Sequence, residues 1–200
     1  TATSEAATSA AATPAAGDYN RSSAWLVGLV GAAQNHSHTG EIGWPYMVRS
    51  LAAAGKLGND VLSAIVSRTD SPSYGFQLEQ GATTLAESWE VKYGMSWNHA
   101  VDGHIDDWFC THIAGLRAGT ETRHYPKAPP ADTTPQPHVL VSRPVEGLTY
   151  AEASRRVSTG TLRLRWSIGA LGRRFVVEVA IPPGTTAHLA LPVADLSQVH

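Results

Sequence analysis

Acidic, indole and imidazole side chains gather in one short stretch of this 200-residue chain. Glu87 and Trp89 follow a Gly-Ala-Thr-Thr run, and His99 stands shortly downstream, where a periodic apolar segment begins. A carboxylate can take a proton from water, an imidazole can hold a hydroxyl, and an indole face can stack on a pyranose ring. The stretch therefore contains the residue types that a sugar-cleaving site uses.

Each of these residues also has an ordinary structural interpretation. Glu87 can be a solvated loop carboxylate, and His99 can be a buried histidine whose ring is satisfied by backbone groups. Trp89 lies in the predicted loop, which makes it the better candidate for a sugar platform. Trp97 and Trp108 share the apolar face of a predicted helix, so both are expected in the core.

A metal site is the alternative that His36, His38 and Glu41 raise, because they lie close together in a polar loop. The chain contains neither HExxH nor CxxC, and the spacing of the three residues fits no common zinc site. The sequence therefore predicts no metal and no cofactor.

Composition excludes several other classes of protein. The formal net charge of −2 and the pI of about 6.5 provide no basic field, so nucleic acid is not expected as a partner. No run of 18 apolar residues occurs, so no membrane span and no membrane partner are expected. Cys110 is the single cysteine, which excludes an internal disulfide.

The first half of the chain has helical periodicity. Ser22 or Ser23 is predicted to cap a first helix that runs to about residue 33, and Pro45 to begin a second that ends at Gly55. The remaining expectations are a third helix from residues 59–60 to before residue 72, an irregular segment over 71–96, and a fourth helix from residue 96 to residue 116.

The second half has a period of two and follows a proline-rich segment. The predicted strands are 139–141, 161–167, 175–181 and 187–191. Leu162, Leu164 and Trp166 alternate with polar residues, which indicates an antiparallel sheet with one buried face.

Helical hairpins whose long connections carry polar and aromatic residues suit an α/α toroid. A complete toroid of six hairpins needs about twelve helices, so the predicted fold class is α+β multidomain: a partial (α/α)6 toroid followed by a small antiparallel β-sandwich. The predicted domains are a disordered tail or linker over 1–20, the C-terminal part of an (α/α)6 barrel over 21–120, a Pro-rich joint over 121–137, and a β-sandwich over 138–200.

Several segments resemble the α-L-rhamnosidases of glycoside hydrolase family 78. Residues 68–90, RTDSPSYGFQLEQGATTLAESWE, resemble the family pattern GATTxWExW, with Ala86 where that pattern usually has tryptophan. Residues 96–116 resemble its SxNHYAxG segment, and residues 38–55 resemble its glycine-rich loop and following helix. Residues 138–167 and 173–192 resemble its C-terminal β-sandwich.

The resemblance implies a chemistry and a set of roles. It implies hydrolysis of terminal α-L-rhamnosyl bonds with inversion, with Glu87 as general base, His99 in contact with substrate, and Trp89 and Glu41 in the sugar cleft. The implied partner is a rhamnose-containing oligosaccharide or glycoside. The family's general acid lies in an upstream DxxRE-like motif that these 200 residues lack, so the isolated chain is expected to be inactive. The alternatives are a non-catalytic carbohydrate-binding remnant and another α/α-barrel glycosidase or lyase.

Overall fold

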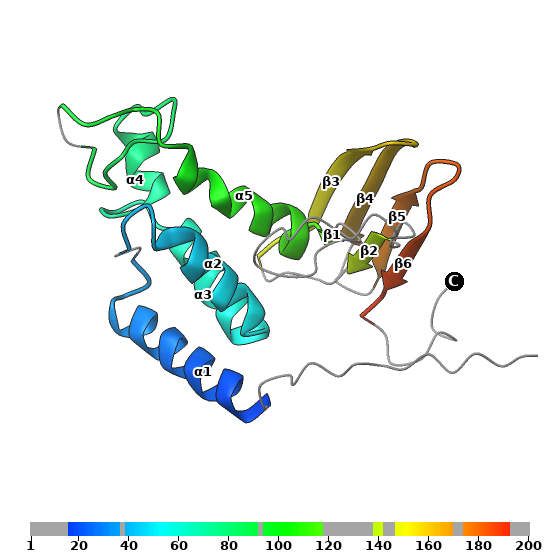
Figure 1. Cartoon of the computed structure of the whole chain (residues 1–200), viewed down its shortest axis with the longest axis horizontal. Coiled ribbons are helices and arrows are strands. Elements are labelled where there is room, and N and C mark those ends of the chain that lie inside the picture. Colours follow the sequence, from blue (N-terminus) through cyan, green and yellow to red (C-terminus); the bar gives the residue numbers. More distant parts are fainter. Residues whose placement is uncertain are drawn as a thin grey trace, which may run out of the picture. The chain divides into compact units, whose positions relative to one another are not determined.

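The computed structural model describes residues 16–36, 39–91, 94–117, 138–141, 147–169 and 174–192. The chain divides into two compact units, 1–104 and 105–200, and each is described by itself. Helices dominate the first unit and strands the second (Figure 1). Residues 1–15 and 118–137 lie outside the described residues, so the Pro-rich joint and the first part of the predicted tail stay predictions, whereas residues 16–20 of that tail are helical.

Within the described residues of the first unit there are four α-helices: α1 (Ala16–Ala32), α2 (Trp44–Ala53), α3 (Lys56–Val66) and α4 (Tyr74–Glu79). Helix α1 begins before the predicted caps, and Ser22 and Ser23 lie inside it. The prediction of an N-terminus at these serines is therefore wrong. A serine can occupy a helix interior at a small cost in propensity, so a good capping residue does not by itself begin a helix.

The α2–α3 hairpin carries the core of the first unit. Pro45 stands in the first turn of α2, and Gly55 follows the helix with φ of 71°, as predicted. Helix α3 begins directly after Gly55 rather than at Asn59, because the Asn59 amide donates to the Gly55 carbonyl at 2.6 Å and braces the turn. Gly58 lets the helices approach closely, since an added Cβ would lie 1.9 Å from the Leu51 carbonyl oxygen.

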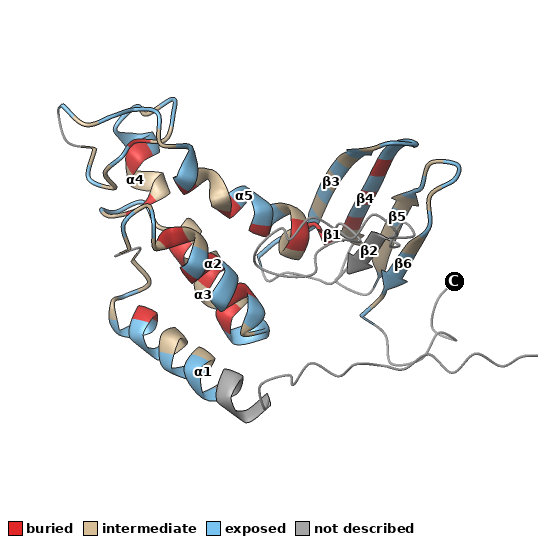
Figure 2. Cartoon of the chain, in the orientation of Figure 1, coloured by how far each residue is buried: buried red, intermediate tan, exposed pale blue. Residues whose placement is uncertain are grey.

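Buried side chains line this hairpin (Figure 2). They are Trp44, Met47, Val48, Leu51 and Ala52 from α2, and Leu62 and Ile65 from α3. Their spacing follows the helical repeat that is typical of an amphipathic hairpin.

Helix α4 lies within the segment that was predicted to be irregular. Its N-cap is the buried Ser73, whose hydroxyl accepts a hydrogen bond from the Phe76 N–H at 3.0 Å. Gly75 has a low helix propensity, which is why the sequence did not predict this helix. An added Cβ at this position would lie 2.2 Å from the Arg68 carbonyl oxygen. Close backbone packing therefore explains this glycine.

The predicted fourth helix is replaced by three short segments with different hydrogen-bond spacing. They are the 3-10 helix η1 (Ala100–His104), α5 (Ile105–Trp108) and the π-helix η2 (Phe109–Ile113). Trp108 is buried as expected, whereas Trp97 precedes all three segments and is 45 % exposed. The prediction that Trp97 belongs to the core is therefore wrong. Among the described residues, no helix is both long and apolar enough to cross a membrane.

The second unit contains two three-stranded sheets. The strands are β1 (Leu116–Arg117), β2 (His138–Val141), β3 (Tyr150–Val157), β4 (Gly160–Ile168), β5 (Phe175–Ala180) and β6 (Ala187–Ala190). Sheet β3-β4-β5 is antiparallel, as predicted. In sheet β1-β2-β6, β2 pairs antiparallel with β1 but parallel with β6, so an all-antiparallel module is wrong for that pair.

Strand β4 provides the core of the second unit. Leu162, Leu164 and Trp166 are fully buried, and the residues between them are exposed. Leu162 and Leu164 pack with Leu116 of β1, and smaller groups from β3, β5 and β6 surround them. The Trp166 indole N–H donates to the Ile113 carbonyl at 2.8 Å. Strand β3 was not predicted, because its sequence is rich in Ala, Ser and Arg rather than in β-branched residues.

Candidate active site

Two loop segments of the first unit are joined side by side, and the candidate residues lie on them. The Glu87 N–H donates to the Ser96 carbonyl at 2.9 Å, and the His99 N–H donates to the Leu85 carbonyl at 3.1 Å. The Thr84 hydroxyl adds a bond to a carbonyl of the second segment at 2.6 Å. These contacts bring Glu87 and His99 onto neighbouring segments, although no regular strand forms there.

Gln77 braces this loop from helix α4. Its side-chain amide donates to the Ser88 carbonyl at 3.3 Å, and its side-chain oxygen accepts from the Ala86 N–H at 3.4 Å. Gln77 and Ala86 are both buried, so the bonds on either side of Glu87 are shielded from water. Nothing in the sequence indicated a role for Gln77, because a glutamine on a short helix is ordinarily a surface residue.

Glu87 itself is exposed. Its Oε2 accepts a hydrogen bond from the Ser96 N–H at 3.0 Å. One carboxylate oxygen is therefore fixed by backbone while the side chain remains open to solvent. A general base needs both properties: a defined direction and access to the water that it deprotonates.

His99 and Glu41 form an ion pair. The His99 Nε2 lies 2.5 Å from the Glu41 Oε2, with the imidazole more buried than the carboxylate. Glu41 lies in the turn before α2, so the pair joins two loops that are distant in sequence. The structure thus brings together two of the predicted site residues.

Asp102 is a neighbouring acid that sequence reasoning missed. It lies in η1 and is 3 % exposed. Burial is the main reason why the pKa of its carboxyl is raised to about 6; within that net value the charge of His99 lowers the pKa and the charge of Glu41 raises it. The backbone carbonyl of Asp102 accepts a hydrogen bond from the Tyr74 hydroxyl. Burial, followed by the charge of Asp102, raises the pKa of Tyr74 above its ordinary value.

Trp89 is held in an aromatic cluster with Trp44 and Tyr74. The ring centroid of Trp89 lies 5.5 Å from that of Trp44 and 4.8 Å from that of Tyr74, and both contacts are edge-to-face. Its indole N–H donates to the Thr39 carbonyl at 3.0 Å. Trp89 is therefore anchored to the loop that precedes Glu41, and its ring is partly buried.

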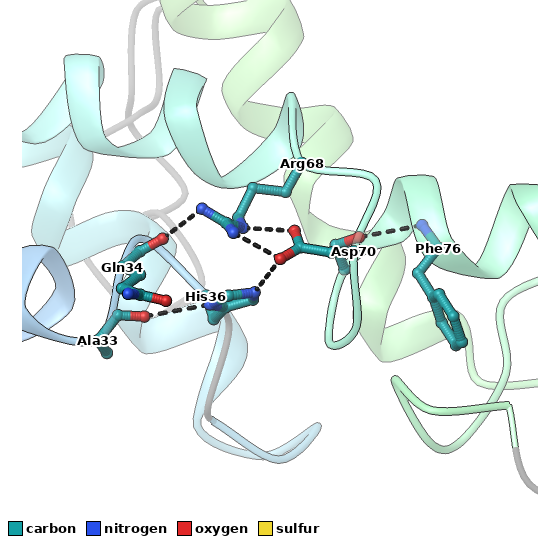
Figure 3. A network of polar contacts seen from close by, with 7 residues as sticks. Ala33, Gln34, His36, Arg68, Asp70 and Phe76 are labelled. Carbon is teal, nitrogen blue, oxygen red and sulfur yellow. Dashed lines mark hydrogen bonds and ion pairs between the residues drawn. The ribbon is translucent and has the colours of Figure 1, made fainter.

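His36 takes part in a separate polar network (Figure 3). Its Nε2 contacts the Asp70 Oδ2 at 3.1 Å, and Arg68 binds both Asp70 oxygens, at 2.7 and 2.6 Å. Arg68 and then His36 lower the pKa of Asp70 to about 2. His38 lies outside the described residues. Across the part of the chain that the structure describes, no group of three metal-ligating side chains comes together.

An open pocket adjoins the paired loop segments at Trp97. Its volume is about 530 Å³, and it is lined by Gln80, Val91, Gly94, Met95 and Trp97. The exposed Trp97 ring therefore borders a surface pocket instead of filling a helix interface.

Comparison with known proteins identifies the class. Residues 7–113 match the bacterial alpha-L-rhamnosidase 6 hairpin glycosidase domain, and residues 136–200 match the bacterial alpha-L-rhamnosidase C-terminal domain. The first match spans more than half of the chain. Helical hairpins followed by strands, with carboxylates and an imidazole on the helical part, define a piece of a six-hairpin glycoside hydrolase.

The chain belongs to the bacterial alpha-L-rhamnosidase family and corresponds to its C-terminal part. It is 28 % identical to alpha-L-rhamnosidases from Streptomyces avermitilis and Formosa agariphila over 176 and 183 residues, in each case 84 % of this chain. It spans only 16 % and 17 % of those relatives. The solved structure of an alpha-L-rhamnosidase from Dictyoglumus thermophilum is similar, with a TM-score of 0.63 and 26 % identity over 80 % of this chain and 16 % of that one.

Proposed function

We propose that these residues serve the hydrolysis of terminal α-L-rhamnosyl bonds with inversion, and that Glu87 is the general base. The observation that carries this proposal is the exposed Glu87 carboxylate, whose Oε2 is fixed by the Ser96 N–H beside His99. In an inverting reaction, one carboxylate activates water on the face of the sugar opposite the leaving group. The names and family of the relatives support rhamnose as the sugar.

The other predicted residues form the substrate contacts in this proposal. The His99–Glu41 pair presents a charged acceptor whose orientation is set by an imidazole, which suits the hydroxyl groups of a sugar. Trp89 gives the cleft an apolar edge, with its ring orientation set by the aromatic cluster. The substrate is accordingly a rhamnose-containing oligosaccharide or glycoside.

An inverting site also needs a general acid, with the two carboxyl groups about 6.5–9.5 Å apart. In the proposal this acid comes from the remainder of the (α/α)6 toroid to which α1–α4 belong, and the two sheets form a β-sandwich. The proposed domain limits remain 21–120 for the helical part and 138–200 for the strands. The 200-residue chain alone is expected to show no hydrolysis.

A chimaera tests the proposal. This chain replaces the corresponding part of the Streptomyces avermitilis relative, and hydrolysis of an aryl α-L-rhamnoside is followed by NMR to record the configuration of the first product. Glu87→Gln should lower kcat by about 10²–10⁴-fold, because the side-chain shape is kept and the base is lost. Glu79→Gln, at an exposed acid of α4, is the matched control and should have no effect.

The proposal fails if the Glu87→Gln chimaera retains full activity, in which case Glu41 becomes the next candidate for the base. A first product of retained configuration would refute inversion separately. If the unsubstituted chimaera folds and binds L-rhamnose without hydrolysis, the chain serves carbohydrate binding.

A further inference from the structure

Asp102 is a buried acid that the proposed reaction does not use. It is 3 % exposed, and its Oδ1 is buried without a hydrogen-bond partner. Its backbone is tied on both sides: the N–H donates to the His99 carbonyl at 3.2 Å, and the carbonyl accepts from the Tyr74 hydroxyl. Burying a carboxyl group without a hydrogen-bond partner lowers the stability of the folded state, so the burial of Asp102 needs an explanation.

His99 has a complementary atom without a partner. Its Nε2 contacts Glu41, whereas its Nδ1 is buried and forms no hydrogen bond. A ring nitrogen and a carboxyl oxygen thus lie three residues apart, on residues that one backbone hydrogen bond already joins. The titratable groups that interact with Asp102 are His99, Glu41 and Tyr74.

We propose that Asp102 and His99 share one proton between Oδ1 and Nδ1, and that Asp102 thereby orients the ring that Glu41 holds from the other side. The inference rests on the proposed function only in that the His99–Glu41 pair contacts the sugar. Asp102 is a positioning residue, because it acts through His99 and touches no substrate. The proposal requires that the Asp102 side chain turns toward the His99 ring, because in the structure neither buried atom has a hydrogen-bond partner.

The proton balance is simple. In one arrangement, a neutral Asp102 donates its proton to the Nδ1 lone pair, and the neutral ring donates Nε2–H to the Glu41 carboxylate. In the other, the proton has moved to Nδ1, which leaves an imidazolium between two carboxylates. The total charge of the three groups is the same in both, so the transfer needs no outside acid or base. In both arrangements Nε2 keeps its hydrogen, so the ring presents the same donor to Glu41.

NMR on the intact 200-residue chain tests the inference directly. The ring nitrogens of His99 are followed by long-range ¹H–¹⁵N correlation, and the Asp102 carboxyl by its ¹³C signal, as pH varies. The Nδ1 signal of His99 should respond in the range near pH 6, where Asp102 gains its proton. An Nδ1 signal that does not respond while Asp102 titrates would overturn the inference without the need for a variant.

Variants sharpen this result. Asp102→Asn has a similar shape but cannot exchange the proton, so the Nδ1 response should disappear. The Asp106→Asn variant should keep it, since Asp106 is an exposed acid in α5. A response that persists unchanged in Asp102→Asn would contradict a shared proton.

Binding of free L-rhamnose provides the link to function. Asp102→Asn should weaken binding by about three- to tenfold, equivalent to one poorly oriented hydrogen bond. If the wild-type chain shows the coupled Nδ1 response but no rhamnose binding, the inference about Asp102 stands and the proposed role of His99 toward the sugar fails. If rhamnose binds and the Nδ1 response is absent, the inference about Asp102 fails alone.

Discussion

Replacing Asp102 by asparagine measures the electrostatic cost of its burial. The pKa of this carboxyl is raised from 3.8 to about 6, mainly by burial, with a lowering by the charge of His99 and a smaller raising by the charge of Glu41 included in that value. Between these two pH values the folded state binds more protons than the unfolded chain. The free energy of unfolding is therefore expected to fall as the pH rises from about 4 to about 6, and to stay lower above that range.

The size of the effect follows from the shift. About two pKa units, at 1.36 kcal/mol for each unit, give at most about 3 kcal/mol. Asparagine has no titrating proton at this position, so the free energy of unfolding of the variant should not fall for this reason as the pH rises. The stability of Asp102→Asn relative to wild type should therefore improve by up to about 3 kcal/mol between about pH 4 and pH 7.

Urea unfolding of both proteins across this pH range provides the measurement, with Asp106→Asn as the exposed control. The difference between variant and wild type cancels the titration of groups that both share. A stability difference that stays constant with pH would refute the reasoning, because it would mean that the Asp102 carboxyl has the same proton affinity in the folded and unfolded chains.

The remaining predictions concern packing and the separate ion network. Trp44→Ala should lower the free energy of unfolding by about 3–5 kcal/mol because the ring is fully buried, whereas Trp97→Ala should change it by less than about 0.5 kcal/mol; equal effects in urea unfolding would contradict the difference in burial. Gly58→Ala should destabilise by about 1–3 kcal/mol, since its Cβ would strike the Leu51 carbonyl, and an unchanged melting temperature would show that the hairpin can open there. Arg68 and His36 lower the pKa of Asp70 to about 2. Their stabilisation of the folded state should therefore be fully present above about pH 4 and be lost as the pH falls toward 2. The stability of Asp70→Asn should not show this loss at acid pH. The same decrease of stability with falling pH in the variant and in the wild type would exclude a contribution from the Asp70 carboxylate.

The sequence predicted features that depend on near neighbours. Pro45 and Gly55 delimit α2 as expected, because each restricts or permits a particular backbone conformation. The alternation along β4 predicted its buried and exposed faces. The motif around Glu87 indicated the family that the comparisons confirm.

Several errors share one cause. Ser22 has the chemistry of a cap and lies inside a helix, and Trp97 has helical spacing but precedes the helical segments. Strand β6 pairs parallel to β2, although the sequence pattern of both suggested an antiparallel module. Local preferences amount to about 1 kcal/mol or less for each residue, so packing against distant segments overrides them.

Sequence alone thus indicated the family and the positions of several elements, since residue type and periodicity are local properties. Only the tertiary structure decided that Glu41 meets His99, that Gln77 supports the Glu87 loop, and that Asp102 is buried next to the pair. Each of these depends on contacts between segments that are separate along the chain. The free energy of a buried hydrogen bond or charge depends on the partner and on the exclusion of water, and neither is encoded in the spacing of residues.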